Sequence, residues 1–186
     1  KQPTRAASRG RFRLPAIRPA EFGALAGGYD AIDRLIREEF PGRALFSPDE
    51  LRGDSDHLRD AVLQRGWPLV SELQGRVAFV LLDRHGHQRR PYLRGHPGLR
   101  GRAMFLTVPS HRPEASVLNM PDARRSFERI QAAARMGFLV RTRVDLELRD
   151  DQRRRSAALA SGAHFLSGDL PGPWPTWAGA QVARCN

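Results

Sequence analysis

The sequence predicts an α/β fold in which helices pack outside a parallel sheet. Helix-like and strand-like segments follow one another along most of the chain, an order typical of repeated strand–helix units. Two of the strand-like segments, 76–82 and 103–108, are continuous apolar runs. Such runs are typical of parallel strands that are buried on both faces.

The first third of the chain is mainly helical in pattern. Apolar residues recur at three- and four-residue spacings within 21–40, which predicts a helix that a Pro-Gly pair terminates. A short strand is expected at 43–46. The tetrapeptide that begins at Ser47 predicts a helix start, with Ser47 as the cap and Glu50 reaching back to the Ser47 backbone N–H. Another short helix is expected at 57–65.

The middle of the chain holds the strand at 76–82, a long polar and glycine-rich loop at 84–102, the buried strand at 103–108 and a weak strand at 116–118. Continuous apolar residues define the two stronger strands, and polar and glycine residues define the loop. We expect the loop to connect the two apolar strands without secondary structure of its own.

The last third repeats the alternation. The pattern predicts a helix at 126–135, a strand at 138–144, a helix at 151–161 and a strand at 164–167, with glycines stopping both helices. An irregular tail follows.

Polar residues stand where most of the predicted strands end. In a (β/α)8 barrel, the carboxyl ends of the strands line the active site. Such a barrel needs eight strands, whereas the chain supplies five or six, so we expect part of a larger domain. The polar strand-end positions are Asp83, Thr107, Asn119, 141–145, Ser167 and Asp169.

Composition excludes several classes of protein. The 186 residues carry a formal net charge of +11, and all but one of the 31 basic residues are arginine. No apolar run approaches the roughly 18–20 residues that span a bilayer, and residues 1–20 lack the apolar core of a signal peptide. The single cysteine, Cys185, excludes an internal disulfide framework and a cysteine-based zinc site. The arginines are scattered and lack interleaved aromatic residues, so we do not expect nucleic acid to be a partner.

The strongest candidate site lies in the strand at 138–144. Side chains alternate along a strand, so Arg141, Arg143 and Asp145 share one face. Two guanidiniums and a carboxylate on a core strand are costly unless they pair or bind a ligand, and the arginine fork matches phosphate oxygens. The functional interpretation is an anion site for phosphate. The alternative is a solvated loop in which Arg143 and Asp145 simply pair.

Weaker candidates surround this strand. Asp169 follows the last strand, where its carboxylate can bind a sugar hydroxyl or an arginine, or can serve only as a turn residue. His85 and His87 have the spacing of a metal ligand pair, but three nearby arginines oppose a cation. The sequence contains no serine nucleophile elbow, phosphate-binding P-loop or metalloprotease helix motif.

Five stretches, taken in order, resemble the calcium-dependent phosphoinositide-specific phospholipase C family of bacteria and fungi. The most specific are Val-Arg-Thr-Arg-x-Asp at 140–145 and Ser-Gly-Ala-x-Phe-x-Ser at 161–167. The stretches are 45–53, 66–68 with 73–83, 102–105, 137–145, and 157–169 with the terminal 183–186.

The resemblance implies the C-terminal portion of a TIM-type (β/α)8 barrel of the phosphatidylinositol phosphodiesterase kind. Residues 1–20 are then an irregular basic lead-in, and residues 21–186 are the C-terminal half of the barrel domain, with the N-terminal half absent. In the family, the two catalytic histidines and most calcium ligands come from the first strands. We therefore expect no catalytic residue and no metal ligand in this chain, which alone is expected to be inactive.

The same resemblance assigns roles to residues of this sequence. Arg141 and Arg143 are expected to contact phosphate or inositol, and Asp145 to orient them. Asp83 and Asp169 lie at strand ends where inositol hydroxyls can be held. The chain departs from the family at His164, where glutamine is usual, and at Gly168, where threonine is common.

The expected activity is cleavage of the phosphodiester between inositol phosphate and diacylglycerol, with histidine acid–base chemistry and calcium as the cofactor. The implied substrate is a phosphoinositide or a related phosphodiester, with peripheral contact to an anionic membrane. The family and Cys185 suggest a secreted or extracytoplasmic protein. Two alternatives stay open, a glycerophosphodiester phosphodiesterase-like enzyme and a non-catalytic barrel that binds anions or lipid.

Overall fold

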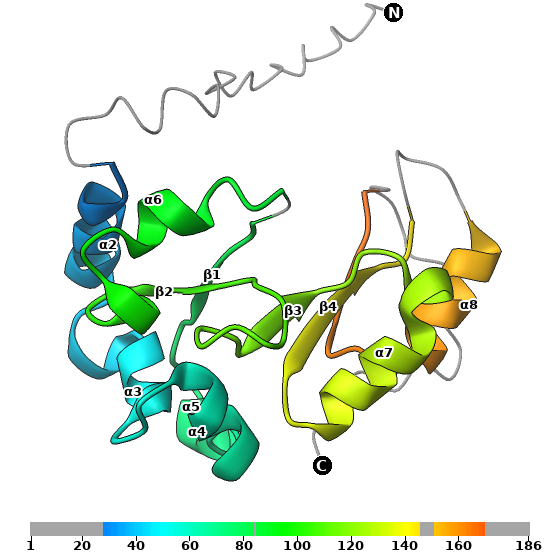
Figure 1. Ribbon diagram of the computed structural model, residues 1–186, viewed down its shortest axis with the longest axis horizontal. Coiled ribbons are helices and arrows are strands. Elements are labelled where there is room, and N and C mark those ends of the chain that lie inside the picture. Colours follow the sequence, from blue (N-terminus) through cyan, green and yellow to red (C-terminus); the bar gives the residue numbers. More distant parts are fainter. Residues whose placement is uncertain (1–27, 84, 146–150, 170–186) are drawn as a thin grey trace, which may run out of the picture.

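The computed structural model describes residues 28–83, 85–145 and 151–169 (Figure 1). The predicted lead-in at 1–20, the irregular tail and Cys185 lie outside the described residues. In chain order, the elements are α2 (Gly28–Glu39), η1 (Gly42–Ala44), α3 (Pro48–Arg52), α4 (Leu58–Gln64), α5 (Val70–Leu73), β1 (Phe79–Leu81), α6 (Arg89–Leu93), η2 (Pro97–Leu99), β2 (Met104–Leu106), β3 (Val117–Asn119), α7 (Ala123–Arg135), β4 (Leu139–Arg143), α8 (Gln152–Ala160) and β5 (Phe165–Ser167).

Every strand pairing in the described residues is parallel and joins strands that are consecutive in the chain. β1 pairs with β2, and β3, β4 and β5 form a three-stranded sheet. A single parallel bridge between Thr107 and Val117 connects the two sheets, and another joins Leu45 to Val77 ahead of β1. The predicted α/β class with parallel strands is confirmed, and the consecutive order is the one that the wall of a barrel requires. The barrel itself stays a prediction.

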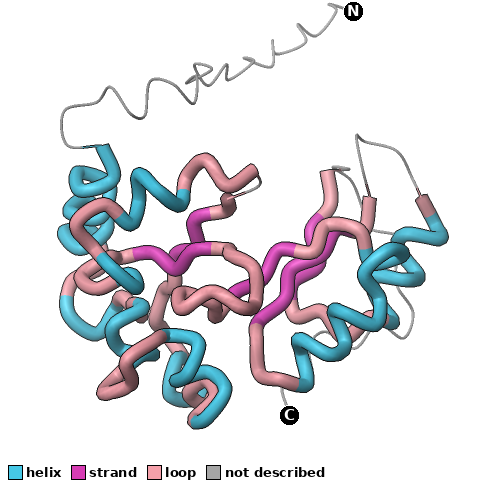
Figure 2. The backbone as a smooth tube through the Cα atoms, viewed as in Figure 1, coloured by secondary structure: helices cyan, strands magenta, loops and turns pink. Residues whose placement is uncertain are grey.

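Helices cover the strands from outside. Figure 2 shows the strands in the middle of the molecule, with α2 to α6 gathered around β1 and β2 and with α7 and α8 beside β4 and β5. Val140 of β4 lies in one apolar cluster with Ile130 of α7 and Ala158 of α8, and all three are fully buried. The alternate residues of β4, including Arg141 and Arg143, are only partly buried. The strand therefore presents its apolar face to the helices and its arginines to the opposite side.

A buried polar network ties α2 to the β2 region. Arg102, which is 2% exposed, donates to Asp30 Oδ1 at 2.5 Å, to Asp33 Oδ2 at 2.9 Å and to the Tyr92 carbonyl at 2.6 Å. The Tyr92 hydroxyl donates to Asp33 Oδ1 at 2.9 Å, and the guanidinium lies 4.5 Å from the Tyr92 ring centroid. Burial and the negative charge of Asp33 raise the pKa of Tyr92, so the phenol stays protonated. The network satisfies charges that would otherwise be costly to bury.

The prediction of a strand at 43–46 is wrong, because the first part of this segment belongs to another type of element. The structure has the short 3-10 helix η1 followed by the one-residue bridge at Leu45. The helix start after Ser47 is confirmed, but the Ser47 side chain makes no capping hydrogen bond. Glu50 instead accepts two hydrogen bonds from Arg76, at 2.6 and 2.8 Å. The charge-assisted contact with Arg76 takes the carboxylate that the capping box would need.

The long loop predicted at 84–102 contains secondary structure, namely α6 and η2. The helix predicted at 126–135 is confirmed, but it begins three residues earlier, at Ala123, because the carboxylate of Asp122 accepts the Arg124 backbone N–H at 3.1 Å and caps it. The strand at 76–82 is shorter than predicted and is not buried on both faces, since Val80 in β1 is 41% exposed.

Two glycine stops were predicted correctly. Gly137 ends the α7 turn with φ +94°, and a Cβ there would lie 3.2 Å from the Val62 carbonyl oxygen. Gly162 closes α8 with φ +77°. Within the ranges that the structure describes, no helix is both long enough and apolar enough to cross a bilayer.

Candidate functional site at the strand ends

The carboxyl ends of β4 and β5 bring together four of the predicted site residues. In register, Arg141 pairs with Phe165 and Arg143 with Ser167, and the Val144 N–H donates to the Ser167 carbonyl at 2.9 Å. The two strands therefore run side by side to their ends and place Arg143 next to the residues that follow β5.

Arg143, Asp169 and Asp145 form a chain of contacts. The Arg143 guanidinium donates to the Asp169 carboxylate, and the Asp169 backbone N–H donates to Asp145 Oδ1 at 2.6 Å. The Arg143 side chain is 11% exposed and that of Asp169 is 42% exposed, while Asp145 is buried. Arg143 thus pairs with Asp169, across two strands, and Asp145 fixes the backbone that carries Asp169.

Arg141 is held from the other side. Its guanidinium donates to the side-chain oxygen of Asn119 at 2.9 Å, and Asn119 is its register partner on β3. Arg141 makes further interactions with its surroundings. The sequence analysis named Asn119 as a polar strand-end position but did not assign it to substrate binding.

Asp83 follows β1 and has a structural task. Its carboxylate accepts the backbone N–H groups of Gln88 at 3.3 Å and Arg89 at 3.2 Å, at the start of α6. Its own N–H donates to the Thr107 hydroxyl oxygen at 2.9 Å, which links the ends of β1 and β2. The Tyr29 hydroxyl donates to the Gln88 side-chain oxygen. Burial, followed by the charge of Asp83, raises the pKa of Tyr29.

The predicted residues therefore fall into two groups. Arg141, Arg143, Asp145 and Asp169 lie together at the ends of β4 and β5, and Asp83 lies with Thr107 at the ends of β1 and β2. The chain leaves β1, β4 and β5 on the upper side of the molecule in Figure 1.

The residue types of the β4–β5 group are suited to binding an anion. Two planar guanidiniums two residues apart on one strand offer several N–H donors to phosphate-type oxygens. Their carboxylate and amide partners fix the orientation of each fork. Desolvation by the flanking strands strengthens such contacts.

The described residues hold no group of three or more histidine, cysteine, aspartate or glutamate side chains that fits a metal ion. Asp169 is engaged by Arg143, and the His85 and His87 rings, 6.1 Å apart, stand outside any carboxylate cluster. The carboxylates described at the strand ends therefore do not fit a calcium shell on their own.

His164 contacts β4 at Val140, the residue before Arg141. Its ring Nδ1 accepts the Val140 backbone N–H at 3.1 Å, and its own N–H donates to the Val140 carbonyl at 2.9 Å. Burial lowers the pKa of His164, which suits an acceptor nitrogen without a proton. This histidine holds the start of β5 against β4 through Val140.

Comparison with known proteins gave two matches. The model of the family described as phosphoinositide phospholipase C, Ca2+-dependent, matches residues 6–185. A solved structure of a calcium-dependent phosphatidylinositol-specific phospholipase C from Streptomyces antibioticus is similar, with a TM-score of 0.55 and 19% sequence identity. The match covers 75% of this chain and 57% of that chain, and at this identity it shows likeness of fold. A comparison with curated proteins found no relative.

Proposed function

The chain belongs to the calcium-dependent phosphoinositide phospholipase C family, and on this premise we propose that it contributes the phosphate-binding side of a phospholipase that cleaves phosphatidylinositol-type lipids. Membership confirms the family that the sequence resembles. The activity is a proposal because the chain spans 57% of the length of the enzyme structure to which it is similar.

One observation carries the proposal: two arginines project from the face of β4 that lies opposite the helices, where Arg141 donates to Asn119 and Arg143 donates to Asp169. In this proposal Arg141 and Arg143 bind the lipid phosphate and offset the charge that develops on its oxygens. Asp145 and Asp169 position Arg143, and Asn119 positions Arg141.

The inositol ring is proposed to lie beside these arginines. Asp169, whose side chain is 42% exposed, has the freedom to accept a ring hydroxyl as well as the Arg143 contact. Asp83 shapes this side of the molecule through the start of α6 and can accept a hydroxyl with its remaining lone pairs.

We propose that the acid–base histidines and the calcium ligands come from residues outside the described ranges. Calcium, when bound, would offset phosphoryl charge alongside the arginines. By the same proposal, residues 21–186 form the C-terminal half of a (β/α)8 barrel, and the natural protein is extracytoplasmic. The consecutive parallel strands and the fold likeness support the barrel.

The test is the Arg143→Ala variant of the longest natural chain that contains these residues, assayed on phosphatidylinositol vesicles with calcium. We expect kcat/KM to fall by about 100-fold or more, the range seen when one preorganised donor to a developing oxyanion is removed. Arg129→Gln, an exposed position on α7, is the matched control and should leave turnover unchanged. Unchanged activity of the Arg143→Ala variant would remove Arg143 from the site.

Two further assays separate the alternatives. Faster turnover of glycerophosphocholine than of phosphatidylinositol would favour a glycerophosphodiester phosphodiesterase. The 186-residue chain alone should bind inositol phosphate weakly and turn over neither substrate. Turnover by this chain alone would contradict the proposal that the catalytic histidines lie outside the described residues.

A further inference from the structure

A run of thirty residues in the middle of the chain carries basic groups and no acidic ones. Residues 84–113 contain seven arginines and four histidines, without a single aspartate or glutamate. Three of these arginines have partners within the protein. Arg102 pairs with Asp33 in the buried network, Arg112 lies 3.7 Å from Glu114, and Arg100 donates to the Asp56 carbonyl at 3.4 Å. The surplus therefore concentrates on α6, at the centre of the first half of the run.

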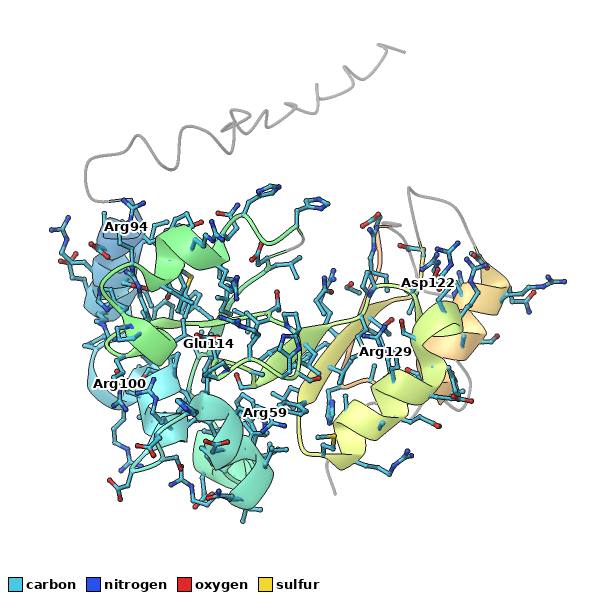
Figure 3. All side chains as sticks on the ribbon, in the orientation of Figure 1. Arg59, Arg94, Arg100, Glu114, Asp122 and Arg129 are labelled. Atoms are coloured by element: carbon cyan, nitrogen blue, oxygen red, sulfur yellow. The ribbon has the colours of Figure 1, made fainter. Side chains whose placement is uncertain are left out.

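Arg90 and Arg94 form the α6 basic patch. They are four residues apart, one inside α6 and one at its C-terminal cap, so their side chains lie on the same side of the helix. Both are exposed, and among the described residues neither has a side-chain hydrogen bond or an ion pair. Figure 3 shows Arg94 at the outer edge of the molecule, far from Arg129 on α7.

The acidic groups of the neighbouring elements are committed elsewhere. Asp30 and Asp33 of α2 are held by Arg102, with His96 also 3.8 Å from Asp30. Asp83 is turned to the backbone at the start of α6. The α6 basic patch therefore has no acidic partner among the described residues.

Two arginines of the α7–α8 region, Arg124 and Arg154, are paired within the protein. Arg124 lies 3.2 Å from Asp151, and Arg154 lies 3.0 Å from Asp122, so acidic partners neutralise them within the protein. Arg129 and Arg135 of α7 are also exposed and have no ion pair among the described residues, so the α6 basic patch differs from them by its position.

The position of the patch indicates its partner. α6 starts six residues after Asp83, so the patch borders the side of the molecule to which β1, β4 and β5 point their carboxyl ends (Figure 1). An anionic surface that touched α6 would face the arginines proposed to bind the lipid phosphate. Nucleic acid fits less well, because Tyr92, the aromatic residue of α6, is fully buried and offers no stacking surface.

We propose that the α6 basic patch docks the protein on an anionic phospholipid bilayer. The inference rests on the proposed function, since that function requires the strand ends to reach a lipid headgroup. The surface potential of the bilayer attracts the two guanidiniums only within about a Debye length, about 8–10 Å at physiological ionic strength. The α6 basic patch therefore acts only on a bilayer that lies close to it.

The experiment measures binding of the full chain to vesicles of phosphatidylcholine with 30 mol% phosphatidylserine, by co-sedimentation, at about 0.1 M salt. These vesicles contain no phosphatidylinositol, so the result does not depend on the inositol site or on turnover. The R90Q/R94Q variant should bind about 10- to 30-fold more weakly, given the usual contribution of each arginine near such a surface. The R129Q/R135Q variant removes the same charge from exposed positions of α7 and should bind as the unchanged chain does.

Three results would overturn the proposal. An equal loss of vesicle binding in the two variants would mean that only the total positive charge matters and that the position of α6 does not. Unchanged binding of R90Q/R94Q would remove the patch from the contact. Tighter binding to a DNA duplex than to the vesicles, with the loss in R90Q/R94Q confined to DNA, would make the patch a nucleic-acid site. Loss of phosphatidylinositol turnover in the Arg143→Ala variant tests the proposed function independently, because that variant should still bind these vesicles.

Discussion

The molecule uses arginine in two different ways, and the comparison between Arg102 and Arg143 makes the difference clear. Arg102 is almost completely buried and donates to two aspartates and a carbonyl while it covers the Tyr92 ring. Arg143 stands at the end of a strand and donates to one aspartate whose own side chain is 42% exposed. Among the described residues, the first guanidinium has three protein acceptors, whereas the second has one carboxylate partner.

A guanidinium with five N–H donors stabilises a fold best when protein acceptors occupy them. Arg102 approaches that condition and links α2 to the region before β2. At Arg143 one carboxylate partner among the described residues orients the fork, and in the proposed function the remaining donors bind phosphate oxygens. The number and burial of the partners therefore distinguish Arg102, which stabilises the fold, from Arg143, which we propose to bind a ligand.

The largest expected effect is on Arg102. Arg102→Ala leaves Asp33 buried beside an uncharged side chain, and removal of one partner from a buried ion pair costs about 3–5 kcal/mol. Urea unfolding followed by circular dichroism measures this loss. We expect a strongly lowered midpoint and a chain close to unfolding at 37 °C.

Arg143→Ala is the matched contrast for stability. Because its partner Asp169 is well exposed, the ion pair should contribute less than about 1 kcal/mol to the free energy of unfolding. A loss as large as that of the Arg102→Ala variant would erase the distinction and make Arg143 a structural residue.

Asp122 offers an intermediate case. Its carboxylate caps α7 and contacts Arg154 at 3.0 Å, so Asp122→Ala should lower the free energy of unfolding by about 1–2 kcal/mol. Burial acts to raise the pKa of Asp122, but the Arg124 hydrogen bond and the Arg154 charge outweigh it and hold the pKa below its usual value.

The lowered pKa gives the Asp122 prediction a pH dependence. The stabilisation is fully present above the unfolded pKa near 3.8 and is lost as the pH falls through the lower folded value. The Asp122→Asn variant should lack this acid-dependent part. Identical acid denaturation profiles for the two proteins would contradict the assignment.

Local signals made some of the fold predictable. The strand at 138–144 and the helix at 151–161 were identified because a short apolar run and a glycine stop are properties of neighbouring residues. The structure places them at Leu139–Arg143 and Gln152–Ala160. The family was identified in the same way, because its motifs are short runs of neighbouring residues that can be recognised in the sequence.

Contacts between distant residues were not predictable from pattern. Arg143 and Asp145 were candidates for a pair because they share a face, yet the parallel register sets Arg143 beside Ser167 and thereby brings in Asp169. α6 was missed because a five-residue helix has little periodicity, and it depends on capping by Asp83. In both cases the deciding partner comes from another element.

Arg141 sharpens the contrast within the site. Arg141→Gln keeps a polar group that can still reach Asn119, so its effect on the free energy of unfolding should be within about 0.5 kcal/mol, as for most surface-like substitutions. Its kcat/KM on phosphatidylinositol should nevertheless fall, because an amide carries no charge for phosphate. A variant that lost stability and kept turnover would place Arg141 with the structural arginines.

The smallest effect is expected at His164, which lies on the structural side of the comparison although it neighbours the site in sequence. Its Nδ1 accepts the Val140 N–H, and burial lowers its pKa, so the folded state prefers the neutral ring. The unfolded chain then binds the proton more readily, and stability falls as the pH drops from above the usual value of 6.5 through the lower folded pKa. His164→Gln keeps an acceptor for Val140 without a titrating group. Urea midpoints of the two proteins should therefore agree at pH 8 and diverge at pH 5, with the glutamine variant the more stable. A midpoint difference that does not change with pH would show that the ring contributes packing alone.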